Sequence, residues 1–137
     1  MTSVGGYTYC WSGRNDGHHL QGVAIVISNR LQPSVVEVTP VDERIMVLRL
    51  KLSFGFMSLI GVYAPTDVCI LDVKEMFYAK LASVADRCPR QDIRIILGDF
   101  HAVSGCDRAG YEMSVCPHGS GADASTQNTI GVRPRAI

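Results

Sequence analysis

Apolar residues in this chain gather in short runs with the spacing of β-strands. Continuous, largely β-branched runs at Gly22–Ser28 and Ile93–Leu97 predict strands that are buried on both faces. From Glu43 to Leu52, leucines alternate with Arg49 and Lys51, which predicts a strand with one face in water. Further strands are predicted at residues 7–11 and 56–64, and a short edge strand at residues 35–38. The pattern thus indicates a strand-rich domain.

One stretch follows a helical period instead. Its apolar residues recur at steps of three and four, at Val73, Met76, Phe77, Leu81, Val84 and Ala85. The helix should end near Cys88, and Asp72 with Glu75 three residues later predicts a capping arrangement at its start. The strands on either side of the helix predict a β-α-β passage, in which the helix packs over the sheet. The two strands before the helix, joined by a turn at Ser53–Gly55, are predicted to form a hairpin.

Two of these strands end on residues that can carry chemistry. Tyr63 stands shortly before the breaker Pro65, and Asp99 follows Gly98, where the last strand should stop. If the two strands are neighbours, the phenol and the carboxylate converge, and with His101 they can orient a water, relay a proton or help to hold a divalent cation. Gly98 and Asp99 also suit an ordinary turn, and Tyr63 and His101 suit structural roles. The residues by themselves leave both interpretations open.

Composition and charge narrow the class of protein. The 137 residues are 47% hydrophobic, which suits one domain with a sizeable core. Lys and Arg together number 13, as do Asp and Glu, so no global basic field attracts nucleic acid, although a local arginine patch can still face phosphates. The five cysteines are irregularly spaced, which predicts reduced thiols in an intracellular protein, nuclear or cytoplasmic. No apolar run approaches the ~20 residues of a membrane helix, so we expect a soluble protein without a membrane partner.

Several short motifs, taken in order, resemble a known family. They are WSG at Trp11–Gly13, GVAIVIS at Gly22–Ser28, IGVYAPT at Ile60–Thr66, LGDFHA at Leu97–Ala102, and DRAGYE followed by PHGSG up to Gly121. They are similar to the endonuclease/exonuclease/phosphatase superfamily, and more narrowly to the apurinic-type endonuclease domain of LINE retrotransposons and the related craniofacial development protein 2-like genes. The resemblance implies an α/β (α+β) fold, part of a four-layer sandwich with two mostly antiparallel sheets flanked by helices. It makes residues 1–121 a partial domain and residues 122–137 an irregular C-terminal tail.

The resemblance also implies an activity and the residues that perform it. Members of the family hydrolyse phosphodiester or phosphomonoester bonds with Mg²⁺. Because the narrower resemblance is to endonucleases that cleave DNA, DNA is the implied partner. By their places in the motifs, Asp99 matches the aspartate that prepares the attacking water, and Tyr63 matches the tyrosine that supports the phosphate. Asp99 is also the candidate metal ligand, and His101 is the third candidate catalytic residue. The candidate substrate-binding residues are Trp11, Arg108 and His118.

Departures from the family pattern predict that this activity is impaired. His101 stands where the family has asparagine, so an amide is replaced by a larger ring that can become cationic. The family's metal-binding glutamate and terminal Asp-His pair have no counterpart in this sequence, and losing one member of a catalytic unit commonly removes most of the rate. An alternative of another class is a non-catalytic module that binds nucleic acid or protein. A third is a truncated gene product without a function of its own.

Overall fold

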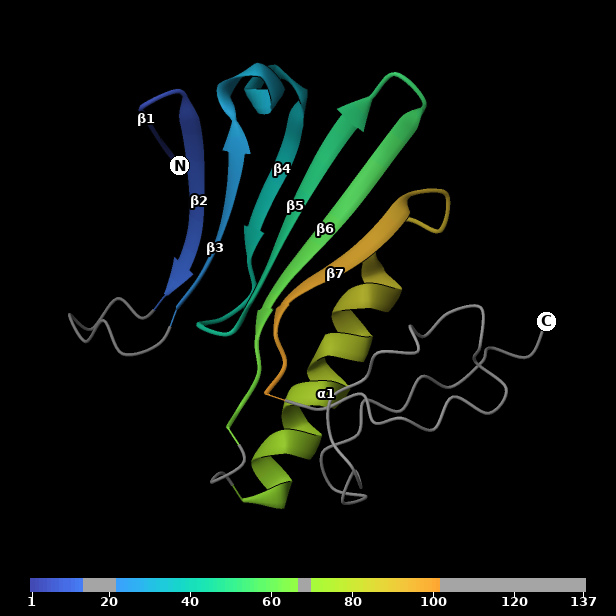
Figure 1. Ribbon diagram of the computed structural model, residues 1–137. Coiled ribbons are helices and arrows are strands. Elements are labelled where there is room, and N and C mark those ends of the chain that lie inside the picture. Colours follow the sequence, from blue (N-terminus) through green and yellow to red (C-terminus); the bar gives the residue numbers. More distant parts are fainter. Residues whose placement is uncertain (14–21, 67–69, 102–137) are drawn as a thin grey trace, which may run out of the picture. The chain divides into compact units, whose positions relative to one another are not determined.

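The computed structural model describes residues 1–13, 22–66 and 70–101. The chain divides into two units, residues 1–100 and residues 101–137, and of the second unit only His101 is among the described residues. Along the first unit come three strands, a 3₁₀ helix, three more strands, an α-helix and a final strand (Figure 1). No helix in this described part of the chain has the length and hydropathy needed to cross a membrane. The tail predicted at residues 122–137 lies outside the description.

A three-stranded antiparallel sheet forms the first layer. Its strands are β1 (Thr2–Val4), β2 (Tyr7–Gly13) and β3 (Gly22–Ser28), side by side in that order. The hydrophobic pattern does not reveal β1, yet its turn signal is present. Gly5 and Gly6 have φ values of 59° and 85°, the left-handed values that a tight two-residue hairpin turn needs.

A four-stranded mixed sheet forms the second layer. Its strands are β4 (Val35–Pro40), β5 (Ile45–Leu52), β6 (Gly55–Tyr63) and β7 (Ile93–Asp99), also side by side in chain order. β5 pairs antiparallel with both β4 and β6, whereas β6 and β7 are parallel. The predicted hairpin, the edge strand and the β-α-β passage are thereby confirmed. The 3₁₀ helix η1 (Asn29–Ser34) connects the two sheets.

The helix α1 (Leu71–Arg87) joins β6 to β7. Its buried side chains, which the apolar period predicts, are Phe77, Leu81 and Val84. It ends at Arg87 with Cys88 as its C-cap residue, which agrees with the end predicted near Cys88. The capping arrangement expected at Asp72 is wrong, because Ile70 is the N-cap residue and no side chain caps the helix. Asp72 lies in the first turn instead, where its negative charge favours the helix dipole.

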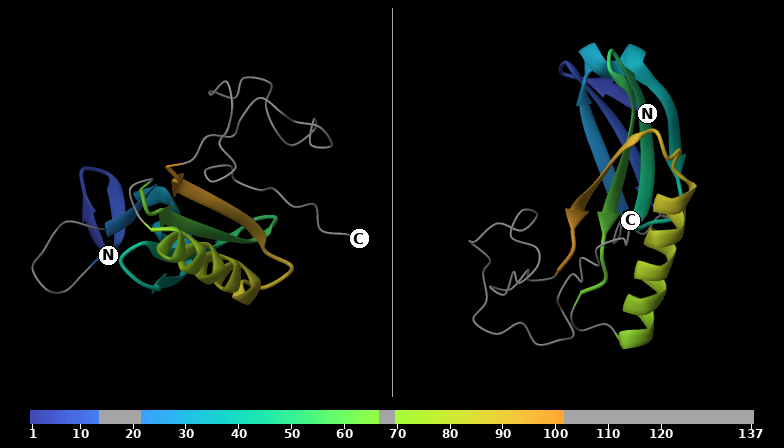
Figure 2. Two further views of the ribbon diagram at one scale, coloured as in Figure 1. Left: turned by 90° about the horizontal axis from the view of Figure 1, so that it is seen from below. Right: turned by 90° about the vertical axis from the view of Figure 1, so that its right-hand side faces the viewer.

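Two apolar cores hold these layers together, because successive side chains of a strand point to opposite faces of its sheet. Between the sheets lie Cys10, Ile25, Ile27, Met46, Leu48 and Leu50. Between the four-stranded sheet and α1 lie Ile45, Ile60, Val62, Ala64, Phe77, Leu81, Val84 and Cys88. Figure 2 shows α1 lying along one face of the four-stranded sheet. The expected fold class is confirmed as α+β, with two mostly antiparallel sheets and a flanking helix.

The burial expected for two strands is wrong. β3 buries Ile25 and Ile27 against the second sheet, but Val26 on its other face is 49% exposed. Every residue of β7 is exposed, although most of them are apolar. A continuous apolar run therefore marks a strand correctly but does not tell how many of its faces other elements cover.

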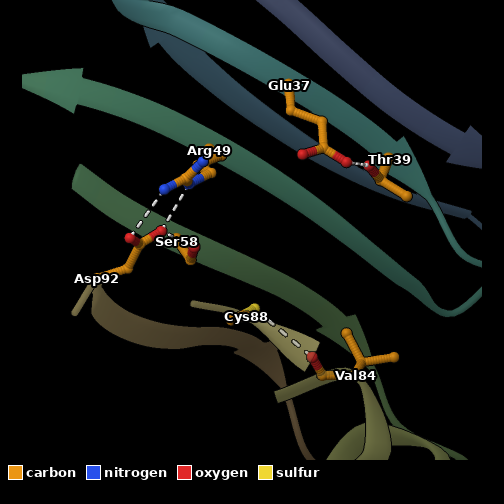
Figure 3. Close-up of polar contacts among 7 residues, drawn as sticks. All are labelled: Glu37, Thr39, Arg49, Ser58, Val84, Cys88 and Asp92. Carbon is orange, nitrogen blue, oxygen red and sulfur yellow. Dashed lines mark hydrogen bonds and ion pairs between the residues drawn. The ribbon is translucent and has the colours of Figure 1, made fainter. Parts of the chain in front are cut away.

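A buried ion pair fastens the chain just before β7 to the middle of the four-stranded sheet (Figure 3). Arg49 on β5 donates to both carboxylate oxygens of Asp92, at 2.7 and 3.0 Å, and the Ser58 hydroxyl donates to the same carboxylate at 2.8 Å. The Asp92 side chain is fully buried, and Arg49 stacks over the ring of Phe56. Hydrogen bonding from Arg49 lowers the pKa of Asp92. The sequence pattern predicts that Arg49 faces water, but in the structure its guanidinium forms this ion pair with the buried Asp92.

Acid should weaken the fold through Asp92. Because its pKa is lower in the folded chain than in the unfolded chain, the ion pair stabilises the fold above about pH 4, and this contribution is lost as pH falls through the folded-state pKa. We expect the Tm to drop between about pH 5 and pH 3, and to drop less in Asp92→Asn, which has no carboxyl there to titrate. Thermal unfolding followed by circular dichroism measures both drops. Equal drops in the two proteins would refute this role of Asp92.

Candidate functional site

The ends of β6 and β7 bring the two leading candidate residues together. In the parallel register of these strands Tyr63 lies directly opposite Asp99, and the N–H of Ala64 donates to the Asp99 carbonyl at 2.8 Å. Opposite residues of a parallel pair point to the same face of the sheet, so the phenol and the carboxylate share one face. The condition under which the two residues converge, that their strands are neighbours, is met. Asp99 is exposed and Tyr63 is half-buried.

Gly98 is what allows β7 to reach this position. Its φ is 149°, and a Cβ atom placed on it would lie 1.9 Å from the carbonyl oxygen of Val62. No side chain fits at such a distance, since atoms that are not bonded repel each other strongly there. With glycine, β7 stays paired through Asp99, whereas the sequence pattern predicts that the strand ends at Gly98.

Arg44 joins this face from the neighbouring strand end, and sequence reasoning missed it. The N–H of Tyr63 donates to the Arg44 carbonyl at 2.9 Å, as in an antiparallel ladder. The N–H of Arg44 turns away to the Asp42 carboxylate, and the Arg44 guanidinium donates to the Tyr63 carbonyl at 3.2 Å in its place. The guanidinium also lies over the Tyr63 ring, 5.5 Å from its centroid. In the sequence, Arg44 shows only as the last residue of a charged triplet before β5.

Asp42 fixes the loop that carries Arg44. Its Oδ1 accepts the backbone N–H groups of Arg44 and Ile45 at 2.8 and 2.9 Å, and its Oδ2 accepts Lys80 of α1 at 2.7 Å. Its carbonyl oxygen accepts the Ser12 hydroxyl from the end of β2. Burial acts to raise the pKa of Asp42, but the hydrogen bonds from Lys80 and the two amides outweigh it, so the pKa is lowered. The charged carboxylate ties the loop to α1, while the carbonyl ties it to β2.

The structure places only some of the other predicted site residues. Trp11 is 55% exposed and lies in a row with Tyr7 and Tyr9 on the outer face of β2, which turns away from the four-stranded sheet. His101 follows Phe100 in the chain, has φ of 44° and belongs to the second unit. Arg108 and His118 lie outside the described residues.

The described residues do not complete the expected magnesium site. Within residues 1–13, 22–66 and 70–101, no three His, Cys, Asp or Glu side chains are grouped so that they could hold a metal ion. Asp99 offers one carboxylate, the kind of ligand that Mg²⁺ prefers.

Comparison with known proteins yields a partial relationship. No family model matches the chain. The chain is similar to craniofacial development protein 2 from Tragulus javanicus, with 27% identity over 84 residues, which are 61% of this chain and 15% of that protein. The protein of the same name from Bos taurus is 26% identical over 84 residues, 61% of this chain and 14% of that protein. The chain therefore spans about one seventh of the length of these curated relatives, and the match supports a related family.

Proposed function

We propose that this chain is part of an endonuclease-like domain of the LINE retrotransposon type, whose reaction is hydrolysis of a phosphodiester bond in DNA. The observation that carries the proposal is the placement of Tyr63 opposite Asp99, on one face at the ends of two parallel strands. The motifs around both residues resemble those of endonucleases. The similarity to craniofacial development protein 2 agrees with the narrower part of that resemblance.

Each of the two residues has a definite role in this reaction. The exposed Asp99 carboxylate accepts a hydrogen bond from a water molecule, orients it for in-line attack on phosphorus and takes its proton. As the new P–O bond forms, the P–O bond opposite the attacking water breaks, and the leaving sugar oxygen takes a proton from bulk water. The Tyr63 hydroxyl donates to a non-bridging phosphate oxygen, on which negative charge grows during the attack. By resemblance, Mg²⁺ would bind at Asp99 and offset charge on the phosphate oxygens.

The rate should be low. Where the family has an asparagine, this sequence has His101, whose imidazole differs from an amide in size and in the placement of its nitrogens. In addition, the family's metal-binding glutamate has no counterpart in this sequence. When catalytic groups act as a unit, the loss of one of them removes most of the rate enhancement.

Nicking of supercoiled plasmid by the purified protein with Mg²⁺ tests the proposal. We expect slow nicking that EDTA abolishes. Asp99→Ala should lower the rate by about a hundredfold or more, because a positioned general base contributes about 10²- to 10⁴-fold. Gel separation of nicked and supercoiled plasmid gives the initial rates.

A matched control is Asp72→Ala, which removes an exposed carboxylate from the first turn of α1 and should leave the nicking rate unchanged. Nicking that persists at the same rate in Asp99→Ala would show that Asp99 is not the base. No nicking by a folded wild-type protein would overturn the hydrolytic proposal.

A non-catalytic interaction module is the second candidate, and the exposed apolar surface favours it. Tyr7, Tyr9 and Trp11 are 53%, 38% and 55% exposed in one row on β2, and the apolar side chains of β7 are exposed as well. Exposed aromatic rows of this kind offer stacking or docking surface. Folded protein that binds DNA or a protein partner without nicking plasmid would support this candidate instead.

A further inference from the structure

We propose that Arg44 is the residue that binds the substrate phosphate at this site, through its guanidinium. The choice of a phosphodiester as ligand rests on the proposed function. The assignment of Arg44 rests on its place in the fold, its charge and the way its backbone is held.

Arg44 occupies the same face as the two candidate catalytic residues. β5, β6 and β7 are adjacent strands, and at one end of them Arg44, Tyr63 and Asp99 follow one another across the sheet. The contact of the Arg44 guanidinium with the Tyr63 ring, 5.5 Å from its centroid, puts the positive charge beside the phenol that would face the phosphate. A phosphate held at Tyr63 is therefore within reach of the guanidinium.

The charge of Arg44 is also available. Lys80 pairs with Asp42 and Arg49 pairs with Asp92, but Arg44 forms no ion pair with any residue in the described part of the chain. One guanidinium nitrogen, Nη1, donates to the Tyr63 carbonyl. A guanidinium carries five N–H donors in a planar fork that matches a phosphate, so donors remain for a ligand.

The position of Arg44 is set before any ligand arrives. Its N–H is held by the Asp42 carboxylate at 2.8 Å, and its carbonyl accepts the N–H of Tyr63 at 2.9 Å. A group ordered in advance loses less entropy on binding than a mobile surface arginine does.

Electrostatics gives a reason for a cation here. A carboxylate at Asp99 that prepares the water also repels the negative phosphodiester it must approach. A neighbouring guanidinium offsets this repulsion and stabilises the charge that develops on the phosphate oxygens. Arg44 is a cation that the fold puts on this face, next to Tyr63.

The salt dependence of DNA binding tests the inference without requiring hydrolysis. With a fluorescein-labelled duplex and EDTA present, the slope of log K against log salt concentration should fall in magnitude by about 1 in Arg44→Gln, the loss expected for one phosphate contact. Arg44→Lys keeps the charge and should keep the slope. The control is Arg30, an exposed arginine in η1 at the other end of the strands (Figure 1). Arg30→Gln removes the same charge and should leave the slope unchanged.

A measurement on the wild-type protein keeps the test independent of how the variants fold. Titration with dimethyl phosphate should shift the NMR signal of the Arg44 Nε–H group, assigned by its loss in Arg44→Lys. Equal salt slopes for wild type and a folded Arg44→Gln, an unmoved Arg44 signal, or no DNA binding at all would overturn the inference. Nicking that depends on Asp99, together with equal salt slopes, would refute the assignment of Arg44 but not the proposed hydrolysis. A smaller slope without any nicking would refute hydrolysis and leave Arg44 as a phosphate-binding residue.

Discussion

Replacing Gly98 with alanine should lower the free energy of unfolding by at least about 4 kcal/mol, near the upper end for a single substitution. The added Cβ would lie 1.9 Å from the Val62 carbonyl oxygen and under 3.0 Å from the Val62 carbonyl carbon and nitrogen. These atoms belong to the backbone of β6, so they cannot move aside without breaking the ladder between β6 and β7. An L side chain at φ of 149° is strained in addition. Urea unfolding followed by circular dichroism measures the loss.

Gly55→Ala is the matched control for this experiment. Gly55 also has a positive φ, 134°, but nothing lies within 4 Å of a Cβ placed on it. Gly55→Ala therefore introduces backbone strain without a steric clash, and we expect it to lower the free energy of unfolding by about 1–2 kcal/mol. Similar losses in the two variants would contradict the close approach of Gly98 to Val62.

Replacing Asp92 with asparagine should lower the Tm by on the order of 10 °C. The Asp92 side chain is fully buried, so the substitution leaves the Arg49 guanidinium facing a buried neutral amide. It also weakens the hydrogen bond that the Ser58 hydroxyl donates at this position. Breaking one side of a buried pair costs more than the pair itself contributes, because a charge remains without compensation. Adding Arg49→Met to Asp92→Asn should therefore recover part of the Tm. Differential scanning calorimetry measures all three proteins.

The ion pair between Lys80 and Asp42 provides the comparison. The Lys80 side chain is 52% exposed, and water screens an exposed pair. Lys80→Ala should change the Tm by no more than about 3 °C. An Asp92→Asn variant as stable as Lys80→Ala would show that the buried pair does not hold the start of β7.

Periodicity in the sequence predicts most of the elements and their connections. The alternation along β5, the apolar run of β6 and the three- and four-residue steps of α1 each match one regular structure, and the order of the elements implies the hairpin and the β-α-β passage. Burial is harder to predict from the sequence, because an apolar run looks the same whether or not other elements cover it. β7 shows this most clearly, since its apolar residues are exposed.

The candidate site is predictable only where a strand ends on a polar residue. Tyr63 and Asp99 carry that signal, and their direct opposition follows from the parallel register. Arg44 carries no such signal, because a charged residue in a turn usually faces solvent. Its role depends on the Asp42 carboxylate, which takes the Arg44 N–H and leaves the Tyr63 carbonyl to the guanidinium. An arrangement of this kind depends on three-dimensional geometry that periodicity does not encode.

The parallel pairing of β6 with β7 also sets the order in which the parts of the site assemble during folding. β4, β5 and β6 follow one another through short antiparallel connections, so they can associate while the chain is still largely open. β7 joins only after the chain has passed through α1 and returned, a closure with a larger entropic cost. We therefore expect the contact of Arg44 with Tyr63 to form earlier in folding than the pairing of Tyr63 with Asp99.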